Sequence, residues 1–178
     1  MRGTKREIAS GLTAKQVRER LRYDRETGKL FYRRNIYVGK PGRICCRAGD
    51  EAGCVLNNGY VEVGINNRHF LGHRLIWLIE TGEWPEHEID HKDMDRSNNR
   101  WSNLREATGP QNRANSKPRS KSGFKGVTID KRIANPFRAQ ITVNNRGIYL
   151  GRYKTAQEAH DVYCLAAKEH FGDFARAE

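Results

Sequence analysis

Apolar positions near the start of the chain change their spacing from helical to extended. Two apolar residues follow a capping box at Thr13–Gln16 at helical spacing, which predicts a short helix near residues 14–22. Residues 29–34 follow a glycine and are typical of a strand. Residues 35–53 are rich in glycine, arginine and cysteine and show no period, so we expect a loop there.

The middle of the chain has a clearer alternation. Residues 60–65 alternate apolar and polar, an Asn-Asn pair follows, and residues 68–71 return, which together predict a hairpin. Residues 73–81 then have the pattern of a helix, and Gly82 is placed to end it.

A strand, a loop, a second strand and a helix are predicted next. The strands are expected at residues 88–91 and 104–107, with a loop through 92–99. The helix should begin at the capping box Thr108–Gln111, which has a proline in its first turn, so Asn112 lies in that turn.

The last third of the chain reads as a separate unit. Residues 116–123 contain no apolar side chain and have the composition of a linker. Beyond the linker we predict three strands, an Asn-Asn-Arg-Gly turn between the last two, and one helix that ends at Gly172; the elements span residues 124–130, 137–143, 148–154 and 155–171. Phe137, Ala139, Ile141 and Val143 should share one face of the central strand, and Arg138, Gln140 and Thr142 the other.

Charge points to a polyanionic partner. The 178-residue chain has a net charge of +12, and residues 1–56 carry 14 basic and six acidic groups. Residues 57–115 are slightly acidic, with seven basic and nine acidic groups, whereas residues 116–178 carry 12 basic and six acidic groups. Basic flanks around an acidic centre favour a nucleic-acid clamp around a cation site over a merely solvated basic surface.

Neither a membrane nor an oxidising compartment is indicated. No apolar run approaches the ~20 residues of a membrane span, and the N-terminus lacks the apolar core of a secretory signal. Cys45, Cys46, Cys54 and Cys164 offer neither a Cys-x-x-Cys pair nor a disulfide framework, so we expect reduced thiols in a cytoplasm. A zinc site formed by the first three cysteines stays open as a less favoured alternative.

Candidate chemistry is concentrated between residues 90 and 112. Asp90 and the side-chain oxygen of Asn112 are hard ligands for a divalent ion such as Mg²⁺ or Mn²⁺, and His91 can accept a proton from an attacking water at neutral pH. Asn103 could fix the loop or orient His91. Neighbours on a regular strand point to opposite faces, so Asp90 and His91 can share a site only if the strand ends or bulges there.

This segment resembles the HNH nuclease family, in particular its phage-type homing endonucleases. The motifs that carry the resemblance are His73-Arg74, Asp90-His91, Asn98-Asn99-Arg100, Asn103-Leu104 and Thr108 through Asn112. The resemblance implies a ββα-metal core with Asp90 and Asn112 on the metal, His91 as general base and Asn103 in an orienting role. His73, Arg74 and Asn99 are accessory candidates.

The C-terminal unit resembles the plant ethylene-response-factor DNA-binding domain, on the motifs Ser122–Val127, Tyr149–Tyr153 and Thr155–Ala159. That domain lays a three-stranded sheet in the major groove of DNA. The resemblance implies that the following residues face DNA: Lys125, Thr128, Arg138, Gln140, Thr142 and Tyr149. Arg146 and Arg152 are added as candidates on the same sheet. Gln140, Thr142 and Tyr149 depart from the plant pattern, so the plant target sequence is not implied.

Together these patterns predict an α+β protein that is a metal-dependent endonuclease for double-stranded DNA. Residues 1–56 are expected to form a basic, DNA-contacting segment of helix plus hairpin, and residues 57–115 an HNH nuclease domain. Residues 116–123 are expected to be a linker, and residues 124–178 a sheet-plus-helix DNA-binding domain. With one site per chain, a monomer or weak dimer would act as a strand nickase. The resemblance implies a phage or prophage protein in a bacterial cytoplasm. One alternative is a non-catalytic DNA-binding regulator with a relic HNH fold. The other is a nuclease that acts on RNA or structured junctions, although the deep, narrow major groove of duplex RNA resists readout by a sheet.

Overall fold

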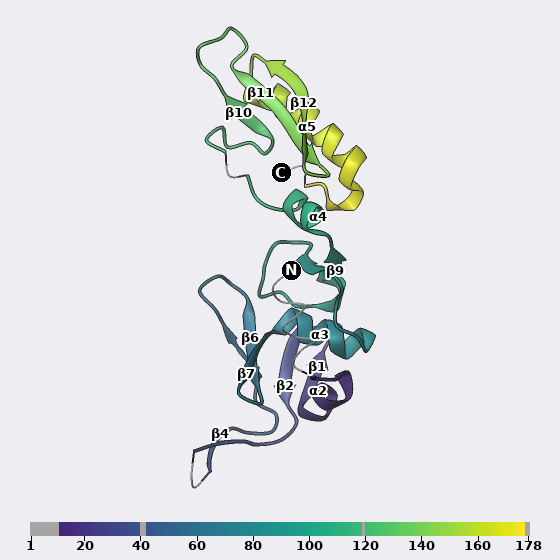
Figure 1. Cartoon of the computed structure of the whole chain (residues 1–178). Helices are drawn as coiled ribbons and strands as arrows, with labels where there is room; N and C mark the ends of the chain where they lie inside the picture. The colour runs from purple at the N-terminus through teal and green to yellow at the C-terminus, as the bar shows by residue number, and fades with distance from the viewer. Residues whose placement is uncertain (1–10, 40–41, 119, 177–178) are drawn as a thin grey trace. The chain divides into compact units, whose positions relative to one another are not determined.

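A computed structural model describes residues 11–39, 42–118 and 120–176 (Figure 1). Contacts within the chain divide it into two compact units, Met1–Glu106 and Ala107–Glu178. Each unit combines small sheets with helices, so the predicted α+β class is confirmed. No helix among the described residues is both long and apolar enough to cross a membrane.

The first unit is built from short elements. In chain order they are α2 Ala14–Arg20, β1 Leu21–Asp24, β2 Lys29–Tyr32, β3 Ile36–Val38, β4 Arg43–Cys46, β5 Cys54–Val55, β6 Val61–Ile65, β7 Arg68–Leu71, α3 Gly72–Thr81, β8 Glu88–His91, the 3-10 turn Trp101–Asn103 and β9 Leu104–Ala107, whose last residue already belongs to the second unit. The sheets are β1-β2, β3-β4, β5-β6-β7 and β8-β9. The predicted hairpin at residues 60–71, helix at 73–81 and strands at 88–91 and 104–107 are confirmed.

Two predictions in this unit are wrong. The first helix ends at Arg20, and Leu21 begins a strand that pairs with β2, because Leu21 is the first of four residues in register with Lys29–Tyr32. The loop predicted over residues 35–53 contains the β3–β4 ribbon instead. Most residues of this ribbon are exposed, so no buried face imposes the alternation by which a strand is recognised in sequence.

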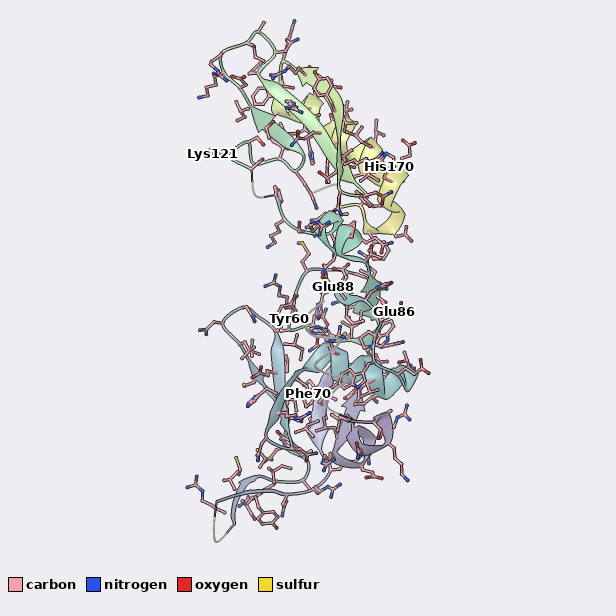
Figure 2. The ribbon with its side chains drawn as sticks, in the orientation of Figure 1. Tyr60, Phe70, Glu86, Glu88, Lys121 and His170 are labelled. Atoms are coloured by element: carbon pink, nitrogen blue, oxygen red, sulfur yellow. The ribbon has the colours of Figure 1, made fainter. Side chains whose placement is uncertain are left out.

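Helix α3 forms the centre of the first core. Leu75, Ile76 and Leu78 are almost fully buried and pack with residues of α2, β1 and β6. The helix ends where Gly82 adopts a left-handed conformation, as the sequence predicts. Phe70, labelled in Figure 2, stacks on Trp84 with ring centroids 5.9 Å apart. The three tryptophans pack against this core, in line with a structural role.

The second unit is a three-stranded antiparallel sheet in the order β10-β11-β12 with a long helix packed on it. Its elements are α4 Gly109–Ala114, β10 Val127–Ile129, β11 Phe137–Val143, β12 Arg146–Tyr153, α5 Ala156–Phe171 and the 3-10 turn Gly172–Phe174. Ala139 and Ile141 are buried, whereas Arg138 and Thr142 are exposed, which confirms the predicted alternation. The capping box at Thr155 that predicts α5 is also present.

Candidate active site

The predicted pair Asp90 and His91 lies where β8 ends. His91 is the last residue of the strand, and its carbonyl accepts a hydrogen bond from the backbone N–H of Met94 at 2.9 Å, which turns the chain. Both residues are only 4% exposed. The strand therefore ends at His91, which is one of the two conditions under which neighbouring residues can serve one site.

Asp90 is held by Arg105 on the paired strand β9. The guanidinium donates to one carboxylate oxygen, Oδ2, from Nε at 2.9 Å and from Nη2 at 2.8 Å. A carboxylate buried to this degree needs such a partner, because an isolated buried charge is costly. Arg105 was not among the predicted site residues, and its only sequence signal is its place on the strand expected to pair with residues 88–91.

His91 is oriented by Asn99. Its Nε2 lies 2.9 Å from the side-chain oxygen of Asn99. Since an amide oxygen only accepts, Nε2 carries the proton, and the lone pair of the neutral ring lies on Nδ1. This tautomer suits a base, because the donor side of the ring is fixed by Asn99 and the proton acceptor is Nδ1.

The position of Asn99 depends on the β1–β2 hairpin, far away in sequence. The Tyr23 hydroxyl donates to the Asn99 backbone carbonyl at 2.8 Å, and Arg100 Nε donates to the Glu26 carbonyl at 2.6 Å. A Cβ at Gly28 would lie 2.7 Å from the carbonyl carbon of Asn99 and 2.5 Å from the backbone nitrogen of Arg100. The hairpin turn is therefore packed directly against the backbone that carries Asn99.

Asn103 fixes the loop between β8 and β9. Its side-chain nitrogen donates to Asp93 Oδ1 at 2.9 Å and to the Asn98 carbonyl at 2.7 Å, and its oxygen accepts from the Asp93 backbone N–H at 3.1 Å. Burial alone would raise the pKa of Asp93, but hydrogen bonds from Asn103 and Asn98 outweigh it and hold the pKa below its ordinary value. Of the two roles considered for Asn103, loop fixation is the one these contacts describe.

His73 on α3 lies edge-on to His91, with ring centroids 5.1 Å apart and an interplanar angle of 80°. Burial is the main cause of a pKa for His73 of about 3, and positive charge on a protonated His91 and on Arg74 contributes to the same lowering. Its Nδ1 is buried without a hydrogen-bond partner among the described residues. His73 is thus a neutral ring that supports one side of the site.

Tyr60, labelled in Figure 2, completes the ring cluster and was not predicted. Its centroid is 5.2 Å from that of His73 and 6.0 Å from that of His91. The guanidinium of Arg96 lies over its outer side, 4.7 Å from the centroid. Arg74, an accessory candidate, donates to the backbone carbonyls of His87 and Pro85 at 3.1 and 3.4 Å and therefore braces the segment before β8.

Asn112 lies in the first turn of α4, as predicted. The capping box between Thr108 and Gln111 is present, and the backbone N–H of Asn112 donates to the Thr108 carbonyl at 2.9 Å. This helix belongs to the second unit. The assignment of Asn112 as a ligand beside Asp90 remains a prediction.

No three histidine, cysteine, aspartate or glutamate side chains of the described residues form a group suited to a metal ion. The three cysteines proposed as alternative zinc ligands are among those residues, and the structure places no disulfide between the four cysteines that it describes. The preferred pair combines one carboxylate, Asp90, with one amide, Asn112, so its donors are the hard oxygens that Mg²⁺ and Mn²⁺ prefer.

The predicted DNA-facing residues lie on several parts of the second unit. Thr128, Arg138 and Arg152 are directly opposite one another across the three strands, and Gln140 is opposite Tyr149. The Arg138 guanidinium lies 5.5 Å from the centroid of the exposed Tyr149 ring. The exposed residues of the predicted set are Thr128, Arg138, Thr142, Arg146 and Tyr149.

Lys125 is engaged elsewhere. Its ammonium group donates to the backbone carbonyls of Arg113, Ala114 and Ser116 at the end of α4. These bonds tie the end of α4 to the segment before β10, and a DNA contact would have to replace them. Part of the predicted linker is thus bonded within the second unit.

Comparison with known proteins finds that residues 70–114 are similar to the HNH endonuclease family, whose model this segment matches. An uncharacterized HNH endonuclease of Acanthamoeba polyphaga mimivirus is 37% identical over 105 residues, which cover 58% of this chain. The aligned region spans 54% of that relative, or about half of its length. No solved structure matches the chain. The matched segment includes Asp90, His91, Asn99, Asn103 and Asn112.

Proposed function

We propose that the protein is a metal-dependent endonuclease that hydrolyses phosphodiester bonds in double-stranded DNA. The observation that carries the proposal is the pair Asp90 and His91, buried side by side at the end of β8 within a segment that matches the HNH endonuclease family. The net charge of +12 supports a nucleic-acid substrate.

His91 acts as the general base. Its Nε2 proton is held by Asn99, so Nδ1 accepts the proton of a water molecule as the water oxygen forms a bond to phosphorus. The bond from phosphorus to the departing sugar oxygen then breaks, and that oxygen takes up a proton from solvent. His73, with its pKa lowered by burial, stays neutral beside His91 and adds no competing charge near pH 7.

Asp90 and Asn112 would hold a divalent ion, Mg²⁺ or Mn²⁺, which when bound stabilises the negative charge that develops on the departing oxygen. Arg105 already pairs with Asp90 through Oδ2, so this carboxylate is fixed in place by its own chain. Asn99 and Asn103 are positioning residues: the first acts on His91 and the second on the loop that follows it.

The second unit supplies sequence recognition. Its exposed sheet face presents Arg138, Thr142 and Tyr149, which have the hydrogen-bonding and ring chemistry of base and phosphate contacts. One HNH segment per chain predicts that a monomer nicks one strand. The relative from Acanthamoeba polyphaga mimivirus supports a viral origin, and the proposed source is a phage or prophage whose protein acts in a bacterial host cell.

The test is a supercoiled-plasmid assay at moderate salt with Mg²⁺, Mn²⁺ or excess EDTA. We expect nicked circles with either metal ion and none with EDTA. Plasmid binding without cleavage, on plasmids that together cover varied sequence, would favour the non-catalytic regulator. Cleavage of structured RNA in preference to duplex DNA would favour the RNA nuclease.

A further inference from the structure

Strands β3 and β4 of the first unit pair only with each other among the described residues, and this ribbon extends away from the other strands of that unit (Figure 1). Tyr37 and Ile44 are paired directly across its two strands, so both side chains lie on one face. They are 60% and 43% exposed, respectively. An apolar pair raised on an isolated ribbon is a feature that monomers seldom leave uncovered.

The charge around this pair has one sign. Residues 33–47 contain five basic residues and no acidic residue. Among them, Arg43 and Arg47 are exposed, and Arg33 and Arg34 also have exposed side chains whose guanidinium groups reach the backbone carbonyls of Leu21 and Glu19. A surface of this charge repels a basic protein partner and attracts a polyanion.

Tyr37 and Ile44 indicate that the partner offers apolar surface in addition to phosphate groups. Phosphate contacts need only cations, whereas Tyr37 and Ile44 gain from contact with apolar surface such as thymine methyl groups or the faces of bases. A two-stranded ribbon is narrow enough to enter a DNA groove. Tyr37 also packs across Gly42, which supports its ring on the ribbon.

We propose that the β3–β4 ribbon is a DNA-gripping arm that inserts the Tyr37–Ile44 face into a groove of duplex DNA while Arg43 and Arg47 contact phosphates. This proposal rests on the proposed function, since it assumes that duplex DNA is the substrate. It adds a contact surface outside both the segment matched to the HNH family and the second unit.

The experiment measures binding of the full-length protein to a fluorescent 40-base-pair duplex of mixed sequence over a range of salt concentrations, without divalent ions. One variant carries Arg43→Gln and Arg47→Gln. A second carries Tyr37→Thr and Ile44→Thr, which place β-branched side chains at both positions and therefore favour the ribbon. The control carries Lys154→Gln and Lys168→Gln, which remove two exposed charges outside the first unit and outside the predicted DNA-facing residues.

The arginine variant should lower the slope of log affinity against log salt by about 2, because each phosphate contact contributes about 0.9. The Tyr37→Thr, Ile44→Thr variant should bind about tenfold more weakly with an unchanged slope, because it loses apolar burial and no charge. The control variant should bind the duplex with nearly the wild-type affinity and nearly the wild-type slope of log affinity against log salt.

Ribbon variants that bind DNA as the control does would overturn the proposal. So would a wild-type dimer that the Tyr37→Thr, Ile44→Thr variant dissociates in sedimentation with unchanged DNA affinity, since the face would then join two copies of the chain. The same preparations are assayed for plasmid nicking with Mg²⁺. If both ribbon variants bind DNA more weakly and the wild type does not nick plasmid, the DNA-gripping arm is supported and the nuclease function is rejected. If the wild type nicks plasmid and the ribbon variants bind DNA normally, the nuclease function is supported and the arm is rejected.

Discussion

At the scale of single residues, the proposed role of His91 depends on the hydrogen bond that orients its imidazole ring. The family motif directs attention to Asn103, but the hydrogen bond to the imidazole comes from Asn99. Asn103 instead binds Asp93 and Asn98 and fixes the loop. Two asparagines four residues apart therefore have different positions: Asn99 is beside the proposed base His91, and Asn103 is within the loop.

Asn99→Ala should lower kcat for plasmid nicking by about 10- to 100-fold, in the range found for residues that orient a functional histidine, with KM unchanged. Asn99→Asp, which keeps an oxygen acceptor of similar shape, should retain more activity than Asn99→Ala. Steady-state kinetics and unfolding of all three proteins check this. Equal losses in both variants, or a rise in KM with constant kcat, would contradict a positioning role.

His73 should make the first unit sensitive to acid. Its pKa falls from about 6.5 in the unfolded chain to about 3 in the folded protein, so below pH 6.5 the unfolded state binds more protons. The stability that the neutral, buried ring contributes is fully present above pH 6.5 and is lost as pH falls towards 3, by up to about 1.4 kcal/mol per pH unit.

Urea unfolding followed by tryptophan fluorescence between pH 7 and 5 measures this slope. His73→Phe should flatten it, and His87→Phe, at an exposed histidine of the same unit, should leave it unchanged. A His73→Phe protein with the full wild-type slope would mean that another group causes the acid sensitivity.

At the scale of elements, sequence reasoning succeeds where a buried face or a cap imposes a pattern. Residues 137–143 alternate because Ala139 and Ile141 face α5, and the capping boxes at Thr108 and Thr155 mark α4 and α5. No residue of β3 or β4 is buried, so the sequence of this ribbon shows no alternation of apolar and polar residues.

Part of the site could not be predicted for a related reason. Arg105, Tyr60 and Tyr23 reach it through contacts between segments distant in sequence, and no local spacing encodes such contacts. Asp90 and His91 could be predicted because they are adjacent and belong to a motif.

The turn of the β1–β2 hairpin should be required for activity. Gly28→Ala places a methyl group against the backbone of Asn99 and Arg100 and also forces alanine to a φ of +76°. Gly49→Ala is the matched control, because Gly49 has a φ of +93° with no atom within 4 Å of an added Cβ.

The strained backbone conformation should lower the free energy of unfolding of both variants by about 1–2 kcal/mol. Gly28→Ala should lower it further, because of the contact with Asn99 and Arg100, and should also slow nicking. Urea unfolding and plasmid nicking of the two variants provide the comparison. Equal effects would show that the contact between the hairpin and the Asn99 backbone has no influence on the site.

At the scale of the whole molecule, the two units have separate cores. One core is formed around α3, and the other lies between the β10-β11-β12 sheet and α5. All three tryptophans, Trp77, Trp84 and Trp101, belong to the first unit. Tryptophan fluorescence therefore reports on that unit alone, whereas circular dichroism reports on both.

Val127→Ala, in the second core, should shift the circular-dichroism unfolding curve by about 1–3 kcal/mol while leaving the fluorescence midpoint unchanged. Val17→Ala, in the first core, should shift the fluorescence midpoint by a similar amount. Fluorescence midpoints that move with both substitutions would mean that the units unfold as one.

The proposed nuclease activity requires His91 to act as the general base. Its most direct test is the nicking rate of a supercoiled plasmid with Mg²⁺ for wild type, His91→Ala and the control His87→Ala. The account predicts a rate about 10²- to 10⁴-fold lower for His91→Ala, with plasmid binding intact and His87→Ala at the wild-type rate. Nicking by His91→Ala at the wild-type rate would contradict it.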